Sequence, residues 1–138
     1  MSYQIHPWKV VETSLDPKHM RLSESLTSTG NGYMGMRGNF EEDYSGDTHL
    51  GTYIGGVWFP DKTRVGWWKN GYPHYFGKAV NCVRLNGIHV EIDGEPLDLN
   101  RAEVLEFSRE LDMQTGLFLR KFMVKTAKGR VAVKAERF

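Results

Sequence analysis

Residues 104–133 read VLEFSRELDMQTGLFLRKFMVKTAKGRVAV, and this stretch decides the fold class. It contains three strand-like runs, Val104–Leu111, Leu117–Lys125 and the run through Val131 and Val133, which are joined by the linkers DMQTG and AKG. Short linkers that contain glycine are typical of turns between adjacent antiparallel strands, and neither linker has room for a crossover helix. The stretch therefore predicts an antiparallel meander.

The preceding segment repeats this pattern. The runs Val80–Leu85 and Ile88–Ile92 flank Asn86-Gly87, a dipeptide that favours two-residue hairpin turns. In the second run apolar residues alternate with polar ones, which is the period of a half-buried strand. We expect a hairpin here and a further turn at Asp93-Gly94.

A glycine-rich stretch, TGNGYMGMRG, lies upstream and has the G-x-G-x-x-G spacing of dinucleotide-binding sites at Gly30, Gly32 and Gly35. That spacing has a mechanism only where the glycines open a helix, and the residues after Gly35 are too rich in glycine to do so. Asn31-Gly32 is instead a hairpin signal between two strand-like runs. We interpret these glycines as a turn, with positive φ at Asn31, Gly32 or both, and as sites of close backbone approach in the strand that follows it.

Only one stretch suggests a helix. Asp16 can cap a helix whose first residue is Pro17, but Ser23 and Ser25 interrupt the periodicity within about two turns. We therefore expect at most a short helical turn near residues 16–22. Because strands and turns occupy nearly everything else, the sequence predicts an all-β fold, an antiparallel β-sandwich, as a single domain over residues 1–138.

Composition excludes several classes of protein. The 138 residues carry a formal net charge of +1, with Lys and Arg interspersed among Asp and Glu, so no basic face for nucleic acid is expected. The single cysteine, Cys82, has no partner for an intramolecular disulfide, and we interpret it as a small buried hydrophobe in a reducing compartment. No apolar run is long enough for a signal peptide or a membrane span. The sequence predicts a cytoplasmic protein that binds neither nucleic acid nor membrane.

Two sets of polar residues suggest a chemical role, and we reject that role for both sets. Glycosidase reactions use a pair of carboxylates, but four acids so close in sequence are most simply kept in water as an exposed loop. These acids are Glu41, Glu42, Asp43 and Asp47. The five histidines show no i, i+4 pairing, so no metal site is expected.

Most of the chain resembles one enzyme family. The runs ESLTSTGNGYMGMRGNFEE, GDTHLGTYIGGVWFPDKTRVGWWKNGYPHYFGK and VEIDGEPLDLN are similar to the N-terminal region of glycoside hydrolase family sixty-five. This is the family of the maltose, trehalose and kojibiose phosphorylases, and the chain resembles its maltose-cleaving members. A long ungapped run of uncommon residues, such as GVWFPDKTRVGWWKNGYP, is more specific than a spaced motif.

The resemblance implies that the catalytic part of the enzyme is absent from these residues. The family combines an N-terminal β-sandwich with linker helices, an (α/α)6 barrel and a small C-terminal β domain. The barrel supplies the general-acid glutamate and binds inorganic phosphate, which attacks the anomeric carbon and inverts it to give β-glucose 1-phosphate and glucose. No residue here matches those positions, so the resemblance implies no catalytic residue and no cofactor. The last run, VAVKAERF, also ends without a turn signal, as though the sandwich were divided within a sheet.

The aromatic stretch TYIGGVWFPDKTRVGWWKNGYPHYF is the best candidate for contact with another molecule. Prolines and glycines interrupt it, so we predict a long structured loop without regular elements. Its rings can anchor a protein interface, form a small internal core or stack on sugars, and the sequence leaves these alternatives open. The candidate contact residues are Trp58, Phe59, Arg64, Trp67, Trp68, Tyr72 and Tyr75.

Two hypotheses for function follow. In the first, the chain is a non-catalytic scaffold whose aromatic loop contacts the catalytic barrel or a second subunit of a phosphorylase. In the second, it is a free-standing carbohydrate-binding module that binds maltose or glucans through the same loop. Unpaired strand edges and uncovered aromatic rings also predict that the chain forms a homo-oligomer.

Overall fold

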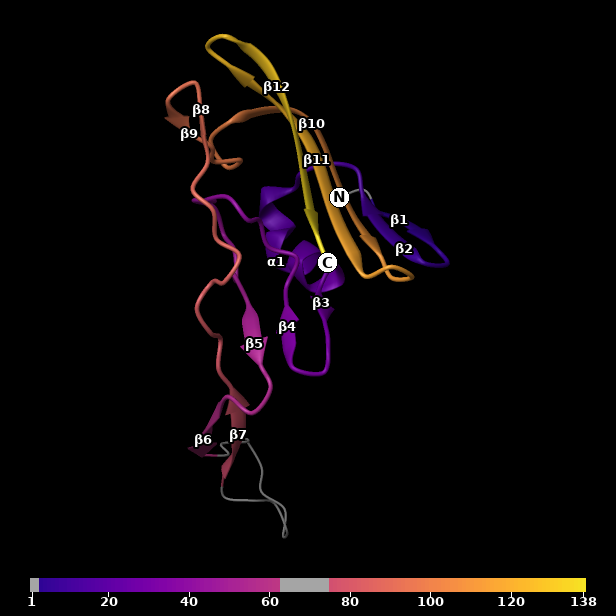
Figure 1. Ribbon diagram of the computed structural model, residues 1–138, viewed down its shortest axis with the longest axis vertical. Helices are drawn as coiled ribbons and strands as arrows, with labels where there is room; N and C mark the ends of the chain where they lie inside the picture. Colours follow the sequence, from indigo (N-terminus) through magenta and orange to yellow (C-terminus); the bar gives the residue numbers. More distant parts are fainter. Residues whose placement is uncertain (1–2, 63–74) are drawn as a thin grey trace.

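The computed structural model of the chain describes residues 3–62 and 75–138. Its strands are β1 (Tyr3–His6), β2 (Lys9–Glu12), β3 (Thr29–Gly30), β4 (Met34–Met36), β5 (Thr52–Ile54), β6 (Trp58–Lys62), β7 (Tyr75–Ala79), β8 (Glu91–Ile92), β9 (Glu95–Pro96), β10 (Glu103–Asp112), β11 (Leu117–Thr126) and β12 (Gly129–Arg137). A short turn of 3-10 helix, η1 (Pro17–His19), leads into the helix α1 (Met20–Leu26). The described residues are strand-rich and their sheets are antiparallel, which confirms the all-β class (Figure 1).

A five-stranded antiparallel sheet, in the order β1-β2-β10-β11-β12, dominates the fold. The predicted meander is confirmed as β10, β11 and β12, which pair along their length apart from a bulge between Val104 and Glu106. Gly116, in the turn between β10 and β11, has a φ of 72°, a left-handed conformation that glycine adopts at little cost. The β1–β2 hairpin joins this sheet beside β10.

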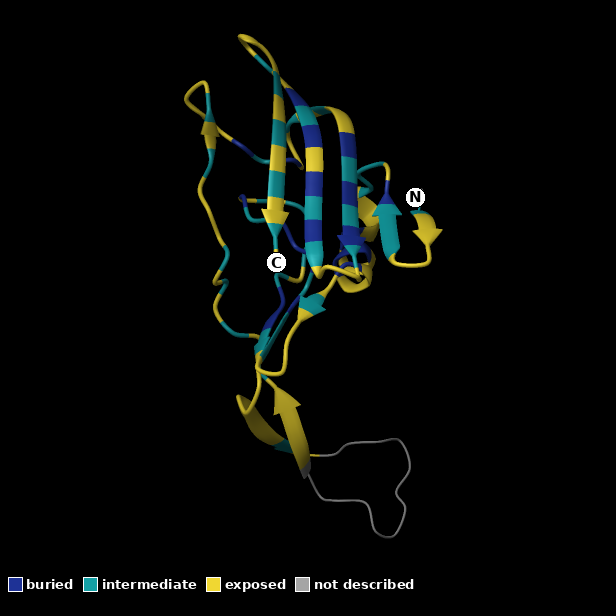
Figure 2. Ribbon diagram, turned by 45° about the vertical axis from the view of Figure 1, so that its right-hand side comes forward, coloured by how far each residue is buried: buried dark blue, intermediate teal, exposed yellow. Residues whose placement is uncertain are grey.

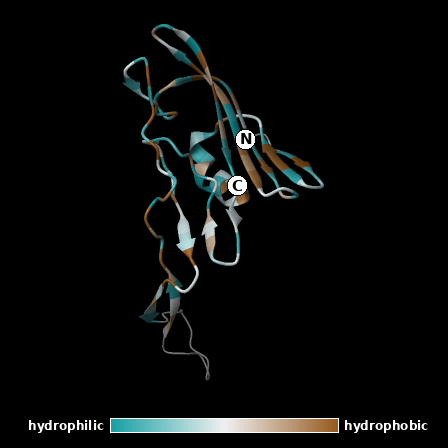
Figure 3. Cartoon of the chain, viewed as in Figure 1, coloured by the Kyte–Doolittle hydropathy of each residue, from teal (hydrophilic) through white to brown (hydrophobic). Residues whose placement is uncertain are grey.

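One face of the five-stranded sheet is buried. Along β10 the side chains of Phe107, Arg109 and Leu111 are buried, and those between them are less so. The same alternation runs along β11, where it appears as stripes (Figure 2), and hydrophobic stretches mark both strands (Figure 3). Because successive side chains of a strand point to opposite faces, this alternation turns one face toward the core.

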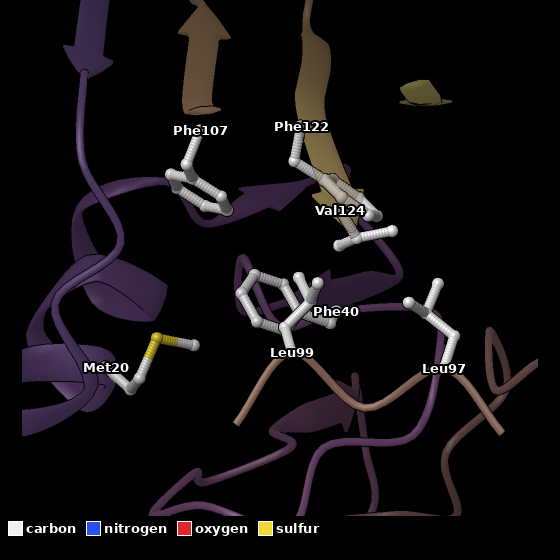
Figure 4. Close-up of a cluster of buried hydrophobic side chains, with 7 residues drawn as sticks. All are labelled: Met20, Phe40, Leu97, Leu99, Phe107, Phe122 and Val124. Atoms are coloured by element: carbon white, nitrogen blue, oxygen red, sulfur yellow. The ribbon is translucent and has the colours of Figure 1, made fainter. Parts of the chain in front are cut away.

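The core lies between this face and a layer built from α1, the segment after β4 and the segment after β9. Phe40 makes edge-on contacts with two other rings, at centroid distances of 6.1 Å to Phe107 and 5.3 Å to Tyr44. Figure 4 shows the buried cluster, which consists of Met20, Phe40, Leu97, Leu99, Phe107, Phe122 and Val124.

The helical segment is longer than predicted. Asp16 caps it as expected, because its side chain accepts a hydrogen bond from Lys18 N at 3.1 Å. The helix then continues through Ser23 and Ser25, so the prediction that these serines end it is wrong. The Ser25 hydroxyl bonds back to the carbonyl of Arg21 at 2.9 Å, and that of Ser23 donates to a side chain outside the helix. Both hydroxyls thus have partners while the helix continues to Leu26, so neither serine ends it.

A smaller sheet, in the order β3-β4-β5, begins with the predicted hairpin at Asn31. The predicted positive φ is wrong, because neither Asn31 nor Gly32 has one. Instead, Asn31 Oδ1 accepts hydrogen bonds from Tyr33 N at 2.8 Å and Met34 N at 3.0 Å. The side chain of Asn31 thereby shapes the loop, which has no need of a left-handed residue.

The G-x-G-x-x-G glycines lie in this hairpin, where Gly30 pairs with Gly35 across β3 and β4. The predicted close backbone approach in the strand after the turn is wrong at Gly35, where a Cβ atom would have nothing within 4 Å. The close approach occurs at Gly30 instead, where a Cβ atom would lie 3.0 Å from the carbonyl oxygen of Met34. The segment that follows β4 is not helical. The spacing therefore serves strand pairing.

The predicted hairpin around Asn86-Gly87 is wrong. Only β8 forms within the second predicted run, and it pairs with β9 rather than with the first run. The backbone of residues 80–92 forms hydrogen bonds with other parts of the chain instead. Cys82 N donates to Thr52 O and Ile88 N donates to Glu41 O, both at 2.7 Å. Contacts with residues far away in the chain therefore replace local pairing.

The predicted turn at Asp93-Gly94 is confirmed as the link between β8 and β9. Both residues have positive φ, 58° at Asp93 and 85° at Gly94, as a tight two-residue hairpin requires. Cys82, in contrast, is half-buried and does not reach the core that we expected for it. Its segment follows the outside of the layer that covers the sheet.

Candidate interaction site

The predicted aromatic loop contains a hairpin, β6 paired with β7, which we call the arm. The expectation that Pro60 prevents regular structure is wrong, because Pro60 lies within β6 opposite Gly77. A strand of a two-stranded sheet has one free edge, where a residue without an N–H group is tolerated. Figure 1 shows the arm at the far end of the molecule from the five-stranded sheet.

The two faces of the arm both carry aromatic side chains. Trp58 and Gly77 share one face, and a Cβ atom at Gly77 would lie 3.0 Å from the indole ring. Phe59 and Phe76 share the other face with Asp61 and Lys78, which form an ion pair. The arm thus carries aromatic rings on both faces, and an ion pair stabilises one of these faces.

These rings are open to solvent. The exposed fraction is 59% for Trp58, 47% for Phe59 and 45% for Phe76, so the first two do not belong to an internal core. An isolated two-stranded hairpin is marginally stable in water, and large exposed apolar surfaces mark contact sites. Tyr33, at the tip of the β3–β4 hairpin, continues the surface and is 83% exposed.

A groove separates the base of the arm from the β3–β4 hairpin. Tyr33, Tyr53 and Trp58 are among the residues that line it. Because glycines line much of it, a partner could approach the backbone closely there. The glycines are Gly32, Gly35, Gly55, Gly56 and Gly77.

The arm contains only part of the predicted contact set. Trp58 and Phe59 lie on β6, and the backbone of Tyr75 begins β7. The predicted residues Arg64, Trp67, Trp68 and Tyr72 lie outside the residues that the structure describes. The exposure of Phe76 and Tyr33 was not predicted, although both are aromatic residues next to a glycine.

The two ends of the arm are fixed at its base. Thr52 accepts a hydrogen bond from Cys82 N at 2.7 Å, and its own N–H donates to Asn81 Oδ1 at 2.9 Å. Further along, the guanidinium of Arg84 donates to the carbonyl oxygens of Phe40 at 3.1 Å and Glu41 at 2.5 Å. The segment that leaves the arm is therefore tied to the layer that covers the sheet.

Beneath that layer lies a charged network, and it corrects the prediction of an exposed acidic loop. Arg120 is fully buried and forms two hydrogen bonds of 2.6 Å to the carboxylate of Glu42, which is 4% exposed. Its third bond reaches Glu41 at 2.5 Å. Of the four acids only Asp43 and Asp47 are exposed, with 58% and 65% of their side-chain surface open to solvent. The other two turn inward because buried arginines face them.

A second buried pair lies beside the first. Arg109 is opposite Arg120 in the β10–β11 register, and its Nε lies 2.8 Å from the carboxylate of Glu12. Both guanidinium groups lie over the ring of Phe40, at 5.2 Å for Arg109 and 4.4 Å for Arg120 from the ring centroid. The sequence held a signal for both arginines, since each occupies an inward position in the alternation of its strand.

The charges also shift the pKa of these groups. Burial acts to lower the pKa of Arg120, but the hydrogen bonds and negative charges of Glu42 and Glu41 more than offset it, so this pKa lies above its ordinary value. Burial lowers the pKa of Arg109, although Glu12 opposes this. The network is thus a balanced set of ion pairs that holds the covering layer on the sheet.

The described residues contain no group of three His, Cys, Asp or Glu side chains that could hold a metal ion. None of the helices within 3–62 and 75–138 is long and apolar enough to cross a membrane. The structure presents a strand-rich fold with a projecting aromatic arm.

Comparison with known proteins identifies the family. Residues 10–138 match the model of glycosyl hydrolase family 65, N-terminal domain, and the chain therefore belongs to this family. It is 53% identical to maltose phosphorylase of Bacillus subtilis over 136 residues, which are 99% of this chain and 18% of that protein. It is also 36% identical to kojibiose phosphorylase of Caldanaerobacter subterraneus, over 90% of this chain and 14% of the relative.

A solved structure gives the same result at the level of the fold. A putative kojibiose phosphorylase from the human microbiome superimposes on 99% of this chain with a TM-score of 0.85 and 30% sequence identity. The match covers 18% of that longer chain. The chain thus spans less than a fifth of the relatives that it matches here.

Proposed function

We propose that this chain forms the non-catalytic N-terminal domain of a maltose phosphorylase, and that its arm docks on the catalytic barrel or on a second subunit of that enzyme. The observation that carries the proposal is the 53% identity to the Bacillus subtilis maltose phosphorylase across 99% of the chain. The lower identity, 36%, to a kojibiose phosphorylase favours maltose over kojibiose as the disaccharide.

In the proposed enzyme, inorganic phosphate is a co-substrate rather than a cofactor. It attacks the anomeric carbon of maltose and releases glucose, with inversion, so that the product is β-glucose 1-phosphate. The catalytic groups belong to the barrel, and the described part of this chain has no role in the chemistry. We place the enzyme in the cytoplasm, where an unpaired thiol such as Cys82 is common.

The form of the arm supports docking rather than sugar binding. A sugar platform needs one flat aromatic face, whereas the arm has Trp58 on one face and Phe59 and Phe76 on the other. Large aromatic side chains of this kind dominate the energetics of protein interfaces. A ribbon with aromatic rings on both faces buries these rings most fully when it inserts between surfaces of a larger partner.

One observation favours the alternative of a carbohydrate-binding module. Trp58 is 59% exposed beside the glycine-lined groove, and an open indole can stack on a sugar ring. Titration of the chain with maltose and longer glucans, followed by tryptophan fluorescence, separates the two functions. A scaffold gives no saturable change, whereas a module gives one that disappears in Trp58→Ser.

The lack of catalysis is tested directly. We expect the purified 138-residue chain to release no glucose 1-phosphate from maltose and phosphate, because the catalytic barrel is not among its residues. The B. subtilis enzyme serves as the positive control in the same assay. Phosphorolysis that co-purifies with the chain through successive columns would overturn the proposal.

The scaffold role is tested in a chimera. The chain replaces the matching 136-residue region of the B. subtilis enzyme, and we expect the chimera to phosphorolyse maltose. Trp58→Ser combined with Phe59→Ser should then lower its temperature of inactivation, because the docked arm loses its anchors. Ile5→Ser, at a site 80% exposed in β1, is the matched control and should change nothing. Equal effects of the two variants would argue against docking by the arm.

A further inference from the structure

Asn31, in the loop of the β3–β4 hairpin, is followed by a glycine, and such a pair can react within itself. The backbone nitrogen after an asparagine can attack the side-chain carbonyl carbon, Cγ, because the two atoms close a five-membered ring. Glycine hinders this attack least, since it has no Cβ. The surroundings of each asparagine–glycine pair therefore decide how readily the pair reacts.

The surroundings of Asn31 favour this attack. Its Oδ1 accepts hydrogen bonds from Tyr33 N at 2.8 Å and Met34 N at 3.0 Å. Oδ1 is the atom that becomes negative when a nucleophile adds to Cγ, and two backbone N–H groups at these distances form an oxyanion hole. Asn31 and Gly32 are also exposed, and a Cβ atom built at Gly32 meets no described atom within 4 Å. Water therefore has access to the reacting groups.

A second pair, Asn86-Gly87, lies in different surroundings. Both polar atoms of the Asn86 side chain are buried and have no hydrogen-bond partner within residues 3–62 and 75–138. A Cβ atom at Gly87 would lie 3.1 Å from the side chain of Arg84, so this glycine is crowded. The described part of the chain thus supplies no donor to an oxyanion at Asn86.

We propose that Asn31 is a site of self-modification, at which the chain forms a succinimide with Gly32 and releases ammonia. The nitrogen of Gly32 bonds to Cγ and passes its proton through water to the departing amide, and the bond from Cγ to Nδ2 breaks. One water molecule then opens the ring at either carbonyl, which yields aspartate or isoaspartate in place of the asparagine. Water is the only co-reactant, and this reaction does not rest on the proposed function.

The two products change the hairpin differently. Aspartate keeps an oxygen at the place of Oδ1, so it accepts the same two N–H bonds and adds a negative charge. Isoaspartate carries the main chain through the former side chain, which lengthens the backbone and moves the acceptor. The reaction to isoaspartate therefore displaces Tyr33, which lines the groove beside the arm.

Peptide mass spectrometry of the 138-residue chain measures the reaction. Cleavage after lysine and arginine places Asn31 in peptide 22–37 and Asn86 in peptide 85–101, where fragmentation distinguishes it from Asn100. A third pair, Asn70-Gly71, lies outside the described residues and falls in peptide 70–78. In the folded chain we expect Asn31 to lose its amide at least about tenfold faster than Asn86. In urea the two should react at similar rates, because neither environment persists.

Two matched variants test the donors. Tyr33→Pro removes the N–H group that bonds to Oδ1, so loss of the Asn31 amide should slow at least about tenfold. Tyr33→Ala keeps this N–H group and should react like the wild type. Circular dichroism checks that both variants keep their fold. Gly32→Ala is a second route, because it leaves the hydrogen bonds in place and should slow the reaction by hindering the attacking nitrogen.

Three results would overturn the proposal. Equal rates at Asn31 and Asn86 in the folded chain would show that their surroundings have no influence. Equal rates in folded Tyr33→Pro and Tyr33→Ala would show that the hydrogen bonds to Oδ1 do not assist the attack. A faster reaction at Asn31 in urea than in the folded chain would show that folding protects this residue instead of activating it.

Discussion

Arg120 shows how single residues hold this fold together. Its guanidinium is fully buried, yet it has carboxylate partners at 2.5 and 2.6 Å and lies over the rings of Phe40 and Phe122. Burying a charge is costly unless it is paired, so the arginine and its acids are stable inside only together. The network therefore specifies which loop covers the sheet, because Glu41 and Glu42 must reach it.

We expect Arg120→Met to lower the free energy of unfolding by about 3–5 kcal/mol, because the change leaves the Glu42 carboxylate buried without a partner. Urea unfolding followed by circular dichroism measures this. Adding Glu42→Leu should recover part of the loss, since an apolar pair can replace a buried ion pair. Arg101→Met is the control, because Arg101 pairs with Asp98 but is 81% exposed, and it should change stability by less than about 1 kcal/mol. Similar losses for Arg101 and Arg120 would contradict this account of the network.

His89 is the residue that should respond to pH. Its ring lies 3.0 Å from Asp43 and 3.2 Å from Glu91, and these bonds, Asp43 first, raise its pKa above 6.5. Arg84 shares Asp43 with it, at 3.3 Å. A raised pKa means that the folded state binds the proton more tightly than the unfolded state.

The stabilisation from His89 is therefore complete below its unfolded pKa and is lost as the pH rises through its higher, folded pKa. Because the ring is 59% exposed, we expect a small effect. Nuclear magnetic resonance titration of the ring should give a pKa above that of a model peptide. His89→Gln should remove this pH dependence of unfolding, and a variant that keeps it in full would point to another group.

At the scale of elements, the hairpins differ in how their turns are built. The β8–β9 turn has left-handed residues at Asp93 and Gly94, whereas the β3–β4 turn relies on the side chain of Asn31. The same Asx-Gly signal thus gives two structures. Which one forms depends on whether the side chain of the first residue bonds within the loop.

Substitutions should separate these two turns. Gly94→Ala places a side chain at φ 85° and should lower the free energy of unfolding by about 1 kcal/mol. Gly32→Ala should be nearly neutral, because Gly32 lacks a positive φ and has open space where a Cβ would lie. Thermal unfolding of both variants beside the wild type gives the comparison. A larger loss at Gly32 than at Gly94 would mean that the turn assignments are reversed.

The meander was predictable from the sequence because its turns are local. Leu117–Thr126 pairs with its two neighbours in sequence, so pattern and linkers contain the information. The segment at residues 80–92 was predicted wrongly, since its backbone bonds go to Thr52 and Glu41 rather than to its own hairpin. Long-range contacts of this kind have no signature in a local pattern. Likewise, the sequence around Glu42 predicts an exposed acid, because only the folded structure shows that the buried Arg120 faces it.

The candidate site was predictable only in part. The aromatic composition predicted Trp58 and Phe59 as contact residues, and the structure shows both exposed on the arm. The composition did not predict that β6 and β7 pair, because a proline such as Pro60 usually indicates that a strand is interrupted. Nor did it predict Tyr33 in the same surface, since that residue comes from a separate hairpin whose position depends on the whole fold.

At the scale of the whole molecule, stability is expected to be uneven. β11 pairs on both sides, with β10 and β12, and its inward side chains are buried. The arm pairs only within itself, and the side chains of Trp58, Phe59 and Phe76 are exposed, in a part of the chain that Figure 2 shows mostly as exposed. Backbone groups with few buried contacts open more often than those at the centre of a sheet.

Hydrogen exchange should reveal this difference. In the isolated chain we expect the amides of β11 to exchange only through global unfolding, and those of β6 and β7 to exchange at least about a hundredfold faster through local opening. Mass spectrometry after timed labelling measures both in one sample. In the chimera with the B. subtilis enzyme, docking should slow exchange in the arm and leave β11 unchanged, because only the arm gains a partner. An arm that is as protected in the isolated chain as β11 would show that it is stable without one, and the reason for proposing docking would be lost.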